Sequence, residues 1–234
     1  VIEGPTDAPL QNVEAERLDH QHALFEHARD IAAAEEVHLR TRSLVAPDVG
    51  SAVLDVVADE DADQLLLGWD GAVGDAEATF GHVLDPILEG ARCDVSLVRL
   101  TGDRIGTPVA LVAPGENAPV VARRAAEFAA VDGTTPTLLH VHAPGAGSRA
   151  DAEAAGRAVV EDAADAAGLA PADYDGRVVV ADDLEAALLD AIEEYDTVCI
   201  GLSDRVDGEG VVYGRVTEHV ARDAAGPVAL IRGA

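Results

Sequence analysis

Short apolar runs alternate with longer amphipathic segments over most of the chain. In the C-terminal half the apolar runs cover residues 108–114, 136–142, 177–181, 197–201 and 227–232. Between them, segments with helical spacing of their apolar residues cover 117–131, 149–167, 184–194 and 214–224. Strands that alternate with helices in this way indicate βαβ units and a parallel sheet. We therefore predict a complete α/β domain over residues 107–234.

The N-terminal half shows the same alternation in a shortened form. Strands are predicted at 37–45, 64–68 and 94–99, with a stub at 1–3, and helices at 14–34, 50–59 and 80–90. The first helix carries an apolar stripe, typical of a helix that packs on a core, made by Leu18, Phe25, Ala28, Ile31 and Ala32. These elements predict another domain over residues 1–100, joined to the next by the linker Thr101 to Thr107.

The two halves are copies of one unit, called here the first repeat (residues 1–100) and the second repeat (residues 107–234). The stretch "LLLGWDGAVGDAEATFGHVLDPILEGARCDVSLVR" aligns without a gap with "VCIGLSDRVDGEGVVYGRVTEHVARDAAGPVALIR". Further upstream, "VIEGP" at the start matches "VHAPG" in the second repeat. The second repeat has a strand and the helix 117–131 ahead of that point, and the first repeat has no counterpart. We therefore predict that the first repeat lacks its first strand and first helix.

Charge indicates the conditions in which this fold works. The chain has 44 acidic and 16 basic residues, a formal net charge of -28, and every basic residue is arginine. A content of 48% hydrophobic residues is too high for a disordered acidic tail. We interpret the composition as that of a folded protein in the salty cytoplasm of a halophile, because concentrated salt screens carboxylate repulsion. The same charge argues against sequence-independent binding of nucleic acid, which needs clustered cations.

Glycines after the fourth strand suggest a family. Gly68, Gly71 and Gly81 lie between a strand and a helix, and with the duplication they resemble the universal stress protein family in its tandem form. The resemblance implies two flavodoxin-like, doubly wound sheets of strand order 3-2-1-4-5 and a non-catalytic module of the stress response. It also implies that the last strands, 94–100 and 227–233, pair within one chain as a pseudo-dimer; a homo-oligomer is left open.

Partners and ligands also follow from this resemblance. Tandem domains of this type resemble stand-alone stress proteins and also the cytoplasmic tails of amino-acid and cation transporters. In members of the family that bind ATP, the glycine turn cradles phosphate, a Ser or Thr follows the third glycine, and an Asp ends the first strand. The chain begins in the middle of a repeat and contains no Met, which favours a fragment of a longer protein.

Both glycine turns depart from the ATP-binding pattern. In the first repeat His82 follows Gly81, and the strand that would carry the Asp is missing. The second repeat keeps Gly201 and Gly214, but the other motif positions are Asp204 and Arg215, and further carboxylates follow at Asp207 and Glu209. Carboxylates oppose a triphosphate. We therefore expect degenerate turns and no cofactor; the alternative is an ATP or AMP sensor, with Mg²⁺, at Gly68, Gly71 and Gly81.

The remaining candidates favour packing roles. His140 and His142 share one face of a predicted strand, next to the crevice of such sheets, but without a third metal ligand. Cys93 and Cys199 lack metal-site spacing, so buried free thiols are expected. Trp69 either stacks on a base or fills a hydrophobic space. We expect no catalytic residue and no metal site.

The charge generates the first testable prediction. Raising KCl from about 0.1 to 3 M should raise the melting temperature, because carboxylates repel one another less when the Debye length shortens. Thermal unfolding followed by circular dichroism across this range measures the effect. A melting temperature that is indifferent to KCl would show that the acidic surface is not an adaptation to salt.

Overall fold

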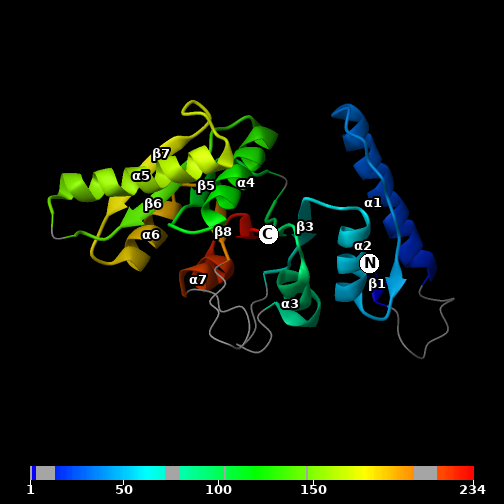
Figure 1. Ribbon diagram of the computed structural model, residues 1–234. Coiled ribbons are helices and arrows are strands. Elements are labelled where there is room, and N and C mark those ends of the chain that lie inside the picture. The colour runs from blue at the N-terminus through cyan, green and yellow to red at the C-terminus, as the bar shows by residue number, and fades with distance from the viewer. Residues whose placement is uncertain (1, 4–13, 72–79, 103, 146, 203–214) are drawn as a thin grey trace. The chain divides into compact units, whose positions relative to one another are not determined.

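The computed structural model of the chain describes residues 2–3, 14–71, 80–102, 104–145, 147–202 and 215–234 (Figure 1). Contacts group the chain into two compact units, Val1–Val56 and Val57–Ala234. This grouping does not follow the boundary between the repeats, because the last two strands of the first repeat lie in the sheet of the second. The division into domains at 1–100 and 107–234 therefore stays a proposal based on the repeat.

The larger unit contains a seven-stranded sheet of order β3-β4-β9-β8-β5-β6-β7. Its strands are β3 (Gln64–Gly68), β4 (Asp94–Arg99), β5 (Pro108–Leu111), β6 (Thr137–His142), β7 (Asp175–Val180), β8 (Thr197–Gly201) and β9 (Val228–Arg232). Within the second repeat the order β7-β6-β5-β8-β9 is the predicted 3-2-1-4-5, and all these strands are parallel. The predicted α/β class is confirmed.

Helices cover both faces of the second repeat's sheet, as Figure 1 shows. On one face lie α4 (Asn117–Asp132) and α5 (Arg149–Ala167), and on the other lie α6 (Leu184–Ile192) and α7 (Arg215–Asp223). The core under α4 and α5 is rich in alanine, which lets these helices approach the sheet and each other closely. This packing fixes the carboxyl ends of β5, β6 and β8, where the candidate site lies.

The two repeats join through an antiparallel pairing of β4 with β9. Leu97 lies opposite Leu230, and both side chains are fully buried. These leucines are equivalent in the repeat, so a local two-fold axis passes between them. The prediction that the last strands pair within one chain is confirmed. The sequence predicted two separate sheets. In the structure β3 and β4 instead extend the sheet of the second repeat, so these strands form one sheet.

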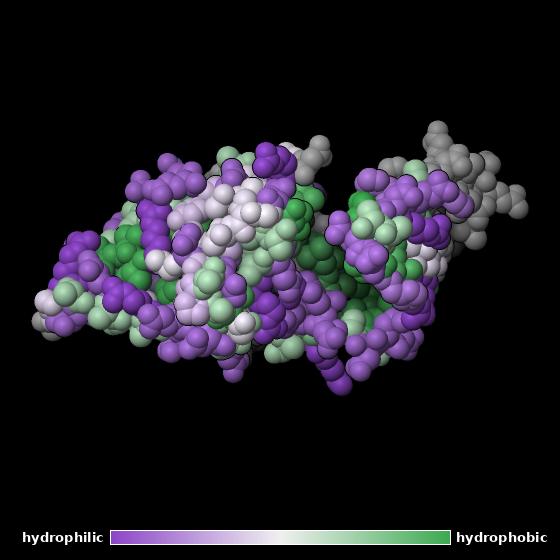
Figure 2. Space-filling view, turned by 90° about the horizontal axis from the view of Figure 1, so that it is seen from above, coloured by the Kyte–Doolittle hydropathy of each residue, from purple (hydrophilic) through white to green (hydrophobic). Residues whose placement is uncertain are grey.

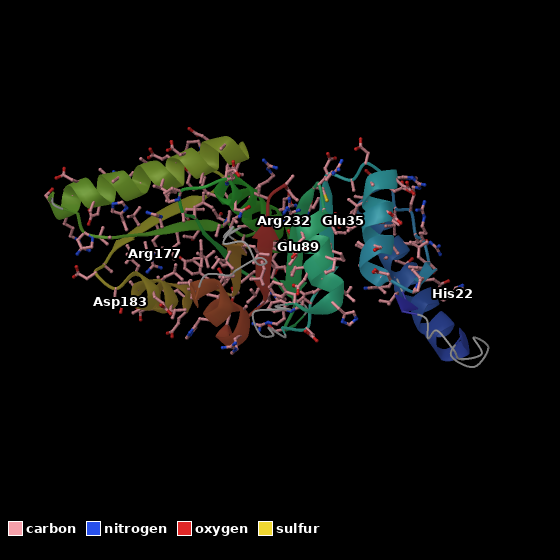
Figure 3. All side chains as sticks on the ribbon, turned by 60° about the horizontal axis from the view of Figure 1, so that its bottom comes forward. His22, Glu35, Glu89, Arg177, Asp183 and Arg232 are labelled. Carbon is pink, nitrogen blue, oxygen red and sulfur yellow. The ribbon has the colours of Figure 1, made fainter. Side chains whose placement is uncertain are left out.

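Two equivalent arginines cross this junction in opposite directions. Arg99 of β4 donates to the carbonyl oxygens of Ala221 at 2.7 Å and Ala224 at 2.5 Å, at the end of α7. Arg232 of β9, labelled in Figure 3, donates to the carbonyl of Ala91 at 2.5 Å, just after α3 (Gly81–Gly90). Carbonyls at a helix C-terminus lack helical partners and carry partial negative charge. Each repeat therefore caps the last helix of the other.

The smaller unit contains elements of the first repeat alone. β1 (Ile2–Glu3) pairs in parallel with β2 (Val45–Ala46), and the helices are α1 (Glu14–Ala34) and α2 (Val49–Asp59), which runs across the boundary between the units. The predicted helix 14–34 is confirmed. The predicted strand 37–45 is wrong for most of its length, because residues 37–44 pair with no described strand.

The apolar stripe of α1 is not buried as expected. Ile31 is 52% exposed, and Phe25, Ala28 and Ala32 are only half-buried. Among residues 22–56 whose burial is described, only Gly50 is buried. A helix buries its stripe only against a surface wide enough to cover it, and the described strands of this unit form a two-stranded sheet.

Candidate functional site

The second repeat contains a cavity of about 800 Å³ at the carboxyl ends of its parallel strands. It lies at the point where the chain order reverses between β5 and β8, the usual ligand crevice of doubly wound sheets. Its floor is apolar, with Leu111, Leu139 and Ile200, and its volume suits a small molecule. The shape alone is therefore compatible with ligand binding, and the polar residues at its rim decide the chemistry.

Asn117, the first residue of α4, ties the strand ends together at the rim of this cavity. Its amide nitrogen donates to the carbonyl of Leu202, and its amide oxygen accepts from the backbone N–H of Gly233 at 2.7 Å. A Cβ atom added at Gly201 would lie 3.2 Å from the Asn117 Cβ. The first glycine of the second turn therefore lies close against α4, and this contact gives the glycine a packing role.

The first-repeat glycines differ in what surrounds them. Gly71 has φ +89°, and an added Cβ would lie 2.8 Å from the Cδ of Arg99. Gly81 also has a positive φ, +84°, but an added Cβ there and at Gly68 would meet nothing within 4 Å. His82 follows in the first turn of α3. The arginine that caps α7 therefore occupies the space over the middle glycine.

Several predicted site residues lie outside the described residues. These are Asp204 and Gly214, together with the carboxylates Asp207 and Glu209 of the same turn. The backbone of Arg215 begins α7, but its side chain is not described. The acidic character of the second turn therefore stays a prediction from sequence.

Charged groups at the rim of the cavity are balanced by partners from the protein. Asp94 lies 3.9 Å from Arg123 and 3.8 Å from Arg124, while the guanidinium of Arg232 is bound to Ala91. Glu116 and Glu185 add negative charge to the lining. A phosphate group in this cavity would be repelled by the carboxylates. The arginines nearby would offset this repulsion only in part, because they already bind partners in the protein.

The two histidines form a packed pair under α5. His140 is buried, and its Nδ1 lies 2.8 Å from the carbonyl oxygen of Val112, so this nitrogen carries the proton and donates it. Its Nε2 lies 3.2 Å from Nδ1 of His142. An added Cβ on Gly156 of α5 would lie 3.3 Å from the His140 ring. The described residues contain no group of three side chains that could hold a metal ion.

The cysteines and the tryptophan are buried. Cys93 and Cys199 are free thiols, as predicted, and burial raises the pKa of both, that of Cys199 to about 12. A thiol with a raised pKa is a poor nucleophile at neutral pH. Trp69 is 8% exposed and meets Phe80 edge to face at 5.5 Å. Its setting agrees with a space-filling role.

Three important residues were missed by sequence reasoning. Asn117 stands at the start of a predicted helix, where an amide side chain is a common capping signal. Arg99 and Arg232 end the two aligned repeats, so the alignment shows that they are equivalent. Their carbonyl partners, however, lie more than 120 positions away in the sequence.

Comparison with known proteins agrees with this architecture. The model of the universal stress protein family matches residues 1–99 and 108–232. A universal stress protein from Archaeoglobus fulgidus is similar in structure, with 17% identity, a TM-score of 0.60, and coverage of 98% of this chain and 81% of that one.

A putative universal stress protein from Pseudomonas aeruginosa is similar too, with 15% identity, a TM-score of 0.59, and coverage of 92% and 78%. No curated protein matches the sequence. At these identities the solved structures show the fold alone, whereas the family model covers both repeats. The chain belongs to the universal stress protein family.

Proposed function

We propose that the protein is a non-catalytic regulatory module of the stress response, which acts through contacts with other proteins rather than through a bound nucleotide. One observation carries this proposal: side chains of the protein occupy the space over two of the motif glycines. Arg99 lies against Gly71, and Asn117 lies against Gly201. Phosphate binding at such turns needs close approach to the backbone amides, and we infer that a side chain packed beside the glycine leaves less room for that approach.

The acidic surface supports the same proposal. Hydrophilic residues, purple in Figure 2, cover much of the visible face, and the net charge is -28. Carboxylates in direct contact with an anionic ligand oppose its binding, and this short-range repulsion persists in concentrated salt. The surface therefore favours cations, water and basic partner surfaces over nucleotides.

The alternative function is an ATP or AMP sensor that uses Gly68, Gly71 and Gly81, with Mg²⁺. What favours it is backbone geometry: Gly71 and Gly81 both adopt a positive φ, as in turns whose amides bind anions. The second-repeat cavity also has the volume of a small-molecule site. This alternative requires the Arg99 side chain to move away from Gly71.

The proposal has a narrower form, in which the module is the cytoplasmic regulatory tail of an amino-acid or cation transporter. Its support is the resemblance to tandem domains of that kind. In the part of the chain that the structure describes, no helix is both long and apolar enough to span a membrane. A complete reading frame that encodes no membrane-spanning helices would exclude this form.

Nucleotide titration tests the proposal against its alternative. ATP with Mg²⁺, titrated in about 2 M KCl, should give no saturable binding tighter than about 100 μM, equivalent to roughly -5.5 kcal/mol. Trp69 fluorescence reports on the first turn, and calorimetry reports on both repeats. Tighter binding that disappears in the variant Gly71→Asp would establish the sensor instead.

A pair of glycine variants tests the packing role directly. Without nucleotide, Gly71→Ala should lower the free energy of unfolding by about 1–3 kcal/mol, because alanine is strained at positive φ and contacts Arg99. Gly81→Ala is the matched control, because Gly81 has a similar positive φ but an added Cβ there meets nothing, so this variant should lose only about 1 kcal/mol from backbone strain. Urea unfolding in high salt measures both. Equal losses for the two variants would contradict the packing role of Gly71.

A further inference from the structure

His140 and His142 of β6 are two polar side chains that the proposed function leaves unused. Residues i and i+2 of a strand point to the same face, and the two rings lie side by side with their centroids 5.4 Å apart. Nε2 of His140 lies 3.2 Å from Nδ1 of His142. One strand thus brings two imidazole nitrogens to the same place.

The hydrogen bonds show which nitrogens carry protons. Nδ1 of His140 lies 2.8 Å from the carbonyl oxygen of Val112, which can only accept, so this nitrogen is the donor. In a neutral imidazole the other ring nitrogen then has a free lone pair. The Nε2 lone pair of His140 is therefore directed at His142, whose Nδ1 donates to it.

Metal-binding histidines adopt this same arrangement. A histidine ligand typically donates its second ring N–H to a carboxylate or a backbone carbonyl, which fixes the tautomer and the orientation of the ring. Val112 accepts this bond from His140, whose ring is buried and packs against Gly156 of α5. The Nε2 lone pair of His140 is therefore held in position before any ion binds.

The separation of the two nitrogens suits a single metal ion. If both metal–nitrogen bonds are about 2.0–2.1 Å long, nitrogens 3.2 Å apart subtend an angle of about 100° at the metal. This angle lies between those of square-planar and tetrahedral coordination. Imidazole is a preferred ligand of Zn²⁺, Cu²⁺ and Ni²⁺, which adopt these geometries.

Water can complete the coordination of such an ion. Within the described ranges, no third histidine, cysteine or carboxylate joins the pair in a metal-binding group. His140 lines the cavity of the second repeat, and His142 is only half-buried. The remaining positions of the ion are therefore filled by water or by a donor atom of a molecule in the cavity.

We propose that His140 and His142 form a two-histidine site for a divalent transition metal ion of the class that prefers imidazole. The ion replaces the proton between the rings: His142 moves that proton from Nδ1 to Nε2, and both lone pairs bind the metal. The neutral pair releases no proton, and the bond from His140 to Val112 is kept. This site goes beyond the proposed function, because a module that acts through protein contacts does not itself require a metal.

The tautomer of His142 gives a direct test. Zn²⁺ is titrated into the isotope-labelled chain in high salt, and long-range proton–nitrogen NMR spectra assign the proton on each ring. We expect saturable binding in which His142 changes from the Nδ1–H to the Nε2–H form, while His140 keeps its Nδ1–H. A pair that only fills space would keep both tautomers, and this result would overturn the proposal.

Variants distinguish this site from the other histidines. Pulsed electron paramagnetic resonance with one equivalent of Cu²⁺ should show two coordinated imidazoles, and His142→Gln should remove this signal while circular dichroism stays unchanged. The matched control combines His22→Gln with His27→Gln, two exposed positions of α1, and should keep the signal. Loss of the signal in the control, or its survival in His142→Gln, would place the metal elsewhere and contradict the proposal.

Discussion

The antiparallel pairing of β4 with β9 is the interaction on which the rest of this structure depends. It is the one antiparallel contact in the described part of the large sheet, and it relates the two repeats by a local axis through Leu97 and Leu230. The axis brings Arg99 and Arg232 to the last helix of the opposite repeat. Because each arginine satisfies carbonyls that the helix leaves unpaired, the repeats stabilise each other through buried polar contacts as well as apolar area.

The same pairing connects the fold to the proposed function. Arg99 reaches α7 only because β4 and β9 are paired, and on its way it fills the space over Gly71. In the second repeat, Asn117 has a similar double role, since it binds the ends of β8 and β9 and packs on Gly201. The packing contacts thus explain why glycines stand at these turns without a bound phosphate. This explanation supports the proposal that the protein acts through its surface.

Local patterns predicted most elements but not the contacts between distant segments. The strands 64–68, 94–99 and 197–201 match their predictions residue for residue, because apolar runs bounded by polar turns specify them locally. Residues 37–40 alternate apolar and polar residues as a strand does, yet a strand also needs a partner along its edge, and none of the described strands pairs with residues 37–44. The arginine caps escaped prediction for a related reason: their partners are backbone carbonyls, which leave no mark in the sequence.

The most direct measurement is the NMR contact between the α-protons of Ser96 and Ile231. The carbonyl of Val98 accepts from Trp69, so Val98 and Ser96, two residues before it, direct their backbone polar groups toward β3. The carbonyl of Ile231 accepts from Leu202, so Ile231 directs its own toward β8. Ser96 and Ile231 therefore face each other as a pair without mutual hydrogen bonds, in which the α-protons lie close. Pairing of β4 with β9 within one chain predicts a strong nuclear Overhauser effect within single chains, in a mixture of labelled and unlabelled protein. Its absence, or its appearance only between differently labelled chains, would contradict the intramolecular pairing of the repeats.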